Sequence, residues 1–78
     1  LVEGSLDSDD LKELLDIGIL PEEGDYQTLG GFVVVMVGRL PRVGDHFEWD
    51  RFRFEIVDMD GNRVDKVLIE RSGERATD

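Results

Sequence analysis

Hydrophobic residues near the start of the chain recur at helical spacing. Asp7, Ser8 or Asp9 can cap the N-terminus of this predicted helix, because short polar side chains accept hydrogen bonds from its first backbone N–H groups. Gly18 is expected to end the helix, since glycine readily adopts the left-handed conformation that follows helix C-termini. The apolar positions of the helix are Leu11, Leu14 and Leu15.

A short strand is predicted before this helix. Leu1 and Val2 are apolar, and Gly4 and Ser5 then interrupt the strand. The chain starts with leucine rather than methionine, so we expect it to be a piece excised from a longer protein.

The apolar segment 29–40 supports two opposite predictions. Its run of valines favours a strand, and Gly30 and Gly31 each weaken a helix by roughly 1 kcal/mol. Against this, Thr28 is a good N-cap, Gly38 stands where a helix-ending glycine belongs, and the apolar span is long for one buried strand. These residues alone support strand and helix almost equally.

Beyond this segment, apolar and polar residues alternate as they do in strands. Asp50 and Arg51 separate two alternating runs and suit a tight connection between antiparallel strands. The alternating apolar residues of the two runs are Phe47, Trp49, Phe52, Phe54 and Ile56.

A second hairpin is predicted at Asp60-Gly61, which leads into a third strand over residues 63–71. Val64 is out of phase with Val67 and Ile69. We therefore expect a bulge near Asp65-Lys66.

Length and composition indicate one small domain. The 78 residues suffice for a single modest core, and the absence of cysteine excludes disulfides and thiolate zinc sites. The formal net charge of −10 disfavours nucleic acid and anionic lipid as partners, and makes divalent cations or a basic protein face the ligands to consider. The alternative is an acidic surface that only keeps the domain in solution. No apolar run approaches the ~20 residues of a membrane helix, so direct membrane insertion of this piece is not expected.

One acidic cluster is a candidate metal site. Asp9, Asp10 and Glu13 fall within about two turns of the first predicted helix, and Asp9 repels Glu13 unless a cation neutralises them. Their carboxylates suit Mg²⁺ or Ca²⁺. The alternative is a solvated acidic face, because neither this stretch nor residues 58–62 has the spacing of a calcium-binding loop.

Catalysis is not indicated. His46 is the only histidine, which gives no support for a histidine-rich metal site or a Ser-His-Asp triad. Gly30 and Gly31 would cradle a phosphate at a helix start, but no phosphate-binding motif accompanies them, and close backbone packing is the simpler interpretation. If residues 32–37 are helical, their outer face suits an interface, with core packing as the alternative.

Two signatures in the middle of the chain resemble those of the CorC/HlyC-type transporter-associated domain. The first is Tyr26-Gln-Thr-Leu-Gly-Gly, and the second is Gly38-Arg-Leu-Pro-Arg-Val-Gly-Asp. The resemblance covers residues 1–71 and leaves 72–78 as a flexible polar tail. The motif positions, interpreted as structural determinants, are Thr28, Gly30, Gly31, Gly38, Arg39, Pro41, Gly44 and Asp45.

The resemblance implies an α+β fold in β-α-α-β-β-β order: a short N-terminal strand, two helices, then a three-strand antiparallel meander. It therefore favours the helix for the valine-rich segment. It also implies a parent membrane protein with paired CBS modules, linked to magnesium and cobalt efflux or described as haemolysin-like, with this domain on the cytoplasmic side.

Three functional hypotheses follow. The first is a non-catalytic regulatory domain that modulates ion transport through contacts with the membrane and CBS domains of its parent. The second is a homodimerisation module that uses the valine-rich helix or a free sheet edge. The third is a sensor of a divalent cation or an adenine nucleotide, the latter implied only by the family's likeness to a flavin-enzyme subdomain fold.

Overall fold

The computed structural model describes residues 1–71, and the predicted tail 72–78 lies outside this part of the chain. The α+β class and the β-α-α-β-β-β order are confirmed. The elements are β1 (Val2–Glu3), α1 (Ser8–Leu15), the 3₁₀ turn η1 (Glu23–Asp25), α2 (Leu29–Val37), β2 (His46–Trp49), β3 (Phe52–Asp60) and β4 (Arg63–Arg71).

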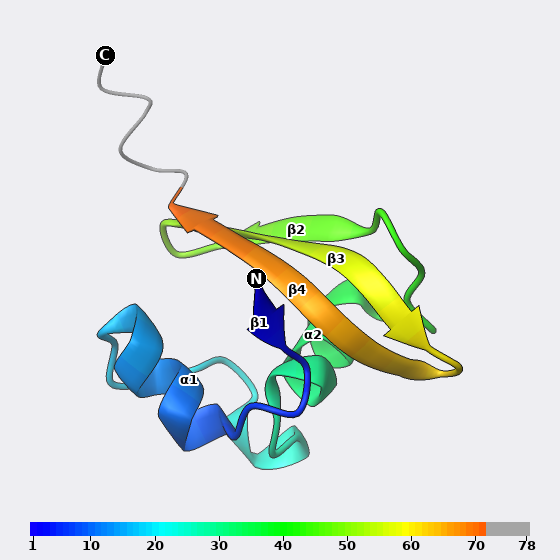
Figure 1. Ribbon diagram of the computed structural model, residues 1–78. Coiled ribbons are helices and arrows are strands. Elements are labelled where there is room, and N and C mark those ends of the chain that lie inside the picture. Colours follow the sequence, from blue (N-terminus) through cyan, green and yellow to red (C-terminus); the bar gives the residue numbers. More distant parts are fainter. Residues whose placement is uncertain (72–78) are drawn as a thin grey trace.

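The four strands form one antiparallel sheet in the order β1-β4-β3-β2. The short first strand therefore joins the opposite end of the chain, with Val2 paired to Val67. Both helices lie against the same face of the sheet, and the other face is left uncovered (Figure 1). The molecule thus has two layers, with the core between them.

The first helix begins as expected and ends earlier than predicted. The Asp7 side chain accepts a hydrogen bond from the backbone N–H of Asp9 and so caps the N-terminus. The helix ends at Leu15, because Asp16 takes the left-handed conformation at φ 58°. The prediction that Gly18 ends this helix is therefore wrong. Leu14, predicted on the apolar face, is 57% exposed.

The valine-rich segment is a helix, as the family resemblance implied. Thr28 accepts a hydrogen bond from the backbone N–H of Gly31, and Gly38 ends the helix at φ 83°. Phe32 and Val33 are fully buried against the sheet. Capping and burial of this face outweigh the strand preference of the valines.

The predicted antiparallel pairing of the last three strands is confirmed, whereas β1 covers Val2–Glu3 rather than Leu1 and Val2. Phe47 faces Phe54 across the first hairpin, and the chain turns at Asp50-Arg51. The second hairpin, between β3 and β4, is also present. Its register shifts at Asp65, which is paired with no residue of β3, and this is the bulge expected near Asp65-Lys66. A second shift at Val57 in β3 was not predicted.

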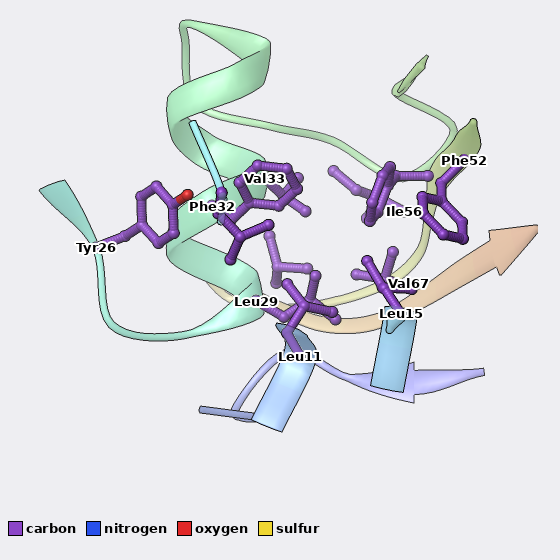
Figure 2. Close-up of a cluster of buried hydrophobic side chains, with 12 residues drawn as sticks. Leu11, Leu15, Tyr26, Leu29, Phe32, Val33, Phe52, Ile56 and Val67 are labelled. Carbon is purple, nitrogen blue, oxygen red and sulfur yellow. The ribbon is translucent and has the colours of Figure 1, made fainter. Parts of the chain in front are cut away.

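Phe32 is the centre of the core. The centroid of its ring lies 5.3–6.0 Å from those of four other aromatic rings, and all four pairs have tilted or edge-to-face geometry. Figure 2 shows it on α2, within the cluster of buried hydrophobic side chains. Its aromatic neighbours are Tyr26, Phe47, Trp49 and Phe54.

Within residues 1–71, neither helix has the length and apolar character needed to cross a membrane.

Candidate functional site

The second signature motif folds into a hydrogen-bonded loop between α2 and β2, named here the 38–45 loop. Arg39 donates two hydrogen bonds to the Asp45 carboxylate, at 3.0 and 2.9 Å. The same carboxylate accepts the backbone N–H of Arg42 at 2.8 Å. The Arg39 guanidinium first, and then the Arg42 N–H, lower the pKa of Asp45. One carboxylate thus holds both sides of the loop.

The 38–45 loop is also attached to the sheet. Gly44, at φ 97°, donates its N–H to the carbonyl of Ile56, and the N–H of Ile56 returns to the carbonyl of Asp45. Pro41 is fully buried. Glycine at 44 is needed for the positive φ, and proline at 41 anchors the loop in the core.

This well-anchored loop presents apolar side chains to solvent. Leu40 is 60% exposed and Val43 59% exposed, although buried Pro41 lies between them. They continue a series of aliphatic residues at every third position that starts on the outer side of α2, where Val34 is 39% exposed. We call this series, Val34, Val37, Leu40 and Val43, the apolar strip, although Val37 is partly buried against the core.

The first signature motif packs the start of α2 against its surroundings. A Cβ at Gly31 would lie 2.8 Å from the Tyr26 Cβ, and one at Gly30 would lie 3.2 Å from the Gly4 carbonyl oxygen. Both glycines are therefore explained by the close approach of neighbouring atoms, which leaves no room for a side chain. This is the packing interpretation rather than the phosphate-binding one.

A phosphate cradle at this helix start is not supported by the hydrogen bonding. The N–H groups of Leu29 and Gly30 donate to the carbonyls of Leu6 and Gly4, at 2.8 and 2.9 Å. The N–H of Gly31 donates to the Thr28 hydroxyl. The N–H groups that would bind an anion are thus already engaged by the protein.

Gly4 is a structural determinant that residue patterns alone did not indicate. Its N–H donates to Asp65 O at 2.8 Å, and its carbonyl accepts the Gly30 N–H. A Cβ at this position would lie 1.9 Å from the Val64 carbonyl oxygen. Gly4 therefore joins β1, β4 and α2 at one point, which only the fold reveals.

A cavity of about 240 Å³ lies beside this junction. It is smaller than most sites that enclose a small molecule. Its wall includes Val34, so the cavity adjoins one end of the apolar strip. The other lining residues are Gly4, Ser5, Thr28, Gly30, Gly31, Asn62, Arg63 and Val64.

The acidic cluster lies on α1, on the other side of the molecule from the 38–45 loop (Figure 1). Asp9 lies 3.4 Å from Lys12, which is also paired with Glu23. Lys12 first, and then the Leu20 N–H, lower the pKa of Glu23. Residues 1–71 bring no three Asp, Glu or His side chains together in a metal-binding arrangement. The proposed ligands Asp9, Asp10 and Glu13 thus share one helix without forming a cage.

Comparison with known families identifies this two-layer fold as a transporter associated domain. The chain belongs to the CorC_HlyC family, whose family model matches residues 1–73.

Within this family, the chain is similar to a UPF0053 protein of Synechocystis, with 52% identity over 88% of this chain and 16% of that protein. It is also 36% identical to the polyamine export protein of Escherichia coli K12, over 99% of this chain and 17% of that protein. The chain therefore spans about a sixth of the length of these curated relatives.

Solved structures agree with this assignment. The CorC_HlyC domain of a Xylella fastidiosa hemolysin, described in complex with Mg²⁺ and Mn²⁺, has 41% identity and a TM-score of 0.76, covering 90% of this chain and 82% of that one. A CorC_HlyC domain from Haemophilus ducreyi has 28% identity and a TM-score of 0.81, covering 90% and 91%.

Proposed function

We propose that this chain is a non-catalytic regulatory domain on the cytoplasmic side of a membrane transporter. It acts through contacts with the membrane and CBS domains of its parent. The observation that carries this proposal is the 38–45 loop, which is anchored by the Arg39–Asp45 pair while Leu40 and Val43 remain exposed.

The physical argument concerns preorganisation. An apolar side chain on a mobile loop loses conformational freedom when it docks, whereas one on a fixed loop has already lost most of it. Bidentate ion pairing, two hydrogen bonds to Ile56 and a buried proline hold this loop in place. Exposed aliphatic residues on such a frame suit a protein contact better than a solvated turn.

The parent is proposed to move cations. The resemblance suggested magnesium or cobalt efflux, and the relatives named as polyamine export proteins make an organic polycation the favoured substrate class. The domain is proposed to modulate this transport rather than to bind the substrate along the permeation path.

The test uses the complete parent transporter. Leu40→Asp with Val43→Asp should change the transport rate several-fold in cells or vesicles, because charge at these positions opposes apolar docking. Gln27→Glu adds charge at another exposed position and is the matched control. Thermal unfolding of the isolated domain checks that the variants fold. Unchanged transport by a folded double variant would contradict the proposal.

A divalent-cation sensor is the second candidate, supported by the Xylella relative described in complex with Mg²⁺ and Mn²⁺. Asp9, Asp10 and Glu13 are the proposed ligands here, since all three lie on the short helix α1, although a bound cation would have to draw their side chains together. A cation that binds only the native state raises its stability. A rise in Tm with Mg²⁺, Mn²⁺, Ca²⁺ or Co²⁺ over EDTA at constant ionic strength, lost in Asp9→Asn with Glu13→Gln, would support it. An equal rise in both proteins would contradict it.

A further inference from the structure

Strand β2 forms one edge of the sheet, because within residues 1–71 its only strand neighbour is β3 (Figure 1). A strand at an edge directs half of its backbone N–H and C=O groups away from the sheet, where they can pair with another strand. The opposite edge is divided between the short strand β1 and the end of β4. β2 is therefore the edge at which one strand alone presents its backbone groups.

A hydrogen bond at the start of β2 shows which of its residues face outward. Ile56 of β3 donates its N–H to the carbonyl of Asp45, so Asp45 bonds to β3. Residues that bond to the neighbouring strand alternate with residues that do not along an antiparallel ladder. His46 and Glu48 therefore direct their N–H and C=O groups to the free edge, whereas the residue that separates them directs its groups to β3.

The apolar side chains of β2 are incompletely covered. Phe47 and Trp49 lie on the face that packs against α2, where both rings lie close to Phe32. Both are nevertheless only half-buried. Their open side is the side on which no further strand follows. A strand added at this edge would therefore extend the core as well as the sheet.

The polar face of β2 carries one imidazole and one carboxylate, two residues apart. His46 and Glu48 are both exposed. Within the molecule, His46 lies opposite Glu55, and Glu48 lies opposite Arg53. Arg53 forms an ion pair of 2.8 Å with Glu55, so its guanidinium is not committed to Glu48. A carboxylate has two acceptor oxygens, and Glu48 thus keeps acceptor capacity toward the free edge.

We infer that β2 of one copy pairs antiparallel with β2 of a second copy, about a two-fold axis at Phe47. In this register His46 of each copy lies opposite Glu48 of the other, and their outward backbone groups form about four hydrogen bonds between the copies. Each imidazole lies beside a carboxylate of the other copy, and such cross-strand pairs stabilise a sheet. The two Phe47 rings meet on the helical face and continue the core.

The side chains select this register over its neighbours. Outward backbone groups also face one another when the strands slide by two residues in either direction. These registers place His46 opposite His46, or Glu48 opposite Glu48. Like charges directly opposite each other destabilise strand pairing, and neither register forms the imidazole–carboxylate pair. Residues 46–48 are therefore complementary to themselves in one of these three registers only.

Two properties follow from this geometry. Because both copies use the same surface, the contact is closed and assembly stops at the dimer. Because the strand is short and each copy has a net charge of −10, the association is weak and needs a high local concentration. The inference goes beyond the proposed function, which uses the 38–45 loop rather than this edge.

The first test is sedimentation equilibrium of the chain at concentrations up to about 1 mM, at which the wild type is expected to form dimers and nothing larger. His46→Glu places two carboxylates opposite each other at both pairs and should weaken dimerisation about tenfold. Gln27→Glu adds the same charge at an exposed position outside β2 and should change it far less. His46→Glu with Glu48→His exchanges the two side chains and should restore wild-type association. All three positions are exposed, so the variants should fold, which circular dichroism checks.

The second test locates the contact on the edge. The N–H groups of His46 and Glu48 should exchange with deuterium more slowly as the concentration rises, because only the dimer gives them partners. The N–H groups of Phe47 and Trp49 face β3 and serve as the internal reference. The inference is overturned by a wild type that stays monomeric to about 1 mM. It is equally overturned by a dimer without added protection at His46 and Glu48, or by a folded exchange variant that fails to dimerise.

Discussion

The Arg39 guanidinium and the Asp45 carboxylate meet through two parallel hydrogen bonds across six residues of chain. Asp45 also accepts the N–H of Arg42 from inside the loop that this pair closes. Planar pairing of this kind constrains orientation as well as distance, which a lysine in place of Arg39 would not do. The pair therefore sets the position at which Leu40 and Val43 are presented.

The first prediction concerns acid stability. The pKa of Asp45 lies below its ordinary value of 3.8 in the folded state, so the native protein binds fewer protons than the unfolded chain in that range. The ionised Asp45 carboxylate contributes its full stabilisation when the pH is above the ordinary pKa, and this stabilisation is lost as the pH falls through the lowered pKa of the folded state. Asp45→Asn should therefore flatten the fall in Tm below about pH 4. If Tm falls equally steeply with decreasing pH in the variant and in the wild type, the prediction is contradicted.

The second prediction concerns the junction at Gly4. Gly4→Ala should destabilise the domain by more than about 2 kcal/mol, because its Cβ would lie 1.9 Å from the Val64 carbonyl oxygen. Gly18→Ala is the matched control, since no atom lies within 4 Å of its added Cβ. Urea unfolding of both variants measures the difference. Similar midpoints for the two would show that the backbone at Gly4 adapts easily.

The third prediction concerns the cap of α2. Thr28→Ala removes the hydroxyl that accepts the Gly31 N–H and should lower the free energy of unfolding by about 1 kcal/mol. Thr28→Ser keeps this acceptor and should lose much less. Chemical denaturation compares the two, and equal losses would assign the effect to the threonine methyl group.

The fourth prediction concerns the end of α1. Asp16 has φ 58°, a conformation that costs a non-glycine residue roughly 1 kcal/mol. Asp16→Gly should therefore raise Tm by a few degrees, and Asp16→Ala should lower it. Thermal unfolding at neutral pH makes the comparison. A lower Tm for the glycine variant would indicate that the Asp16 side chain contributes more than its backbone costs.

The sequence predicted the strands best, because alternation and turn residues are local signals. Phe47, Phe54 and the Asp60-Gly61 turn all lie where the pattern indicated. The ends of α1 illustrate the limit of such signals. Gly18 was the obvious stop, yet Asp16 adopts the left-handed conformation two residues earlier.

The candidate surface was less accessible to sequence reasoning. Arg39 and Asp45 were identified as motif positions, but a separation of six residues matches no periodic structure, and their pairing appears only once the loop is closed. The role of Gly4 depends on Val64, sixty residues away in the chain. The acidic residues of α1 were recognised, whereas the pairing of Lys12 with both Asp9 and Glu23 needed the fold.

The pairing of Val2 with Val67 also has a kinetic consequence. The two hairpins join residues that are close in sequence, so they can form early. The contact between Val2 and Val67 instead closes a loop of nearly the whole described chain, and this entropic cost is not offset until β3 and β4 have paired. Docking of β1 is therefore expected after the rate-limiting barrier. A weakened junction at Gly4 should then leave the refolding rate almost unchanged and accelerate unfolding, which shortens the lifetime of the native state.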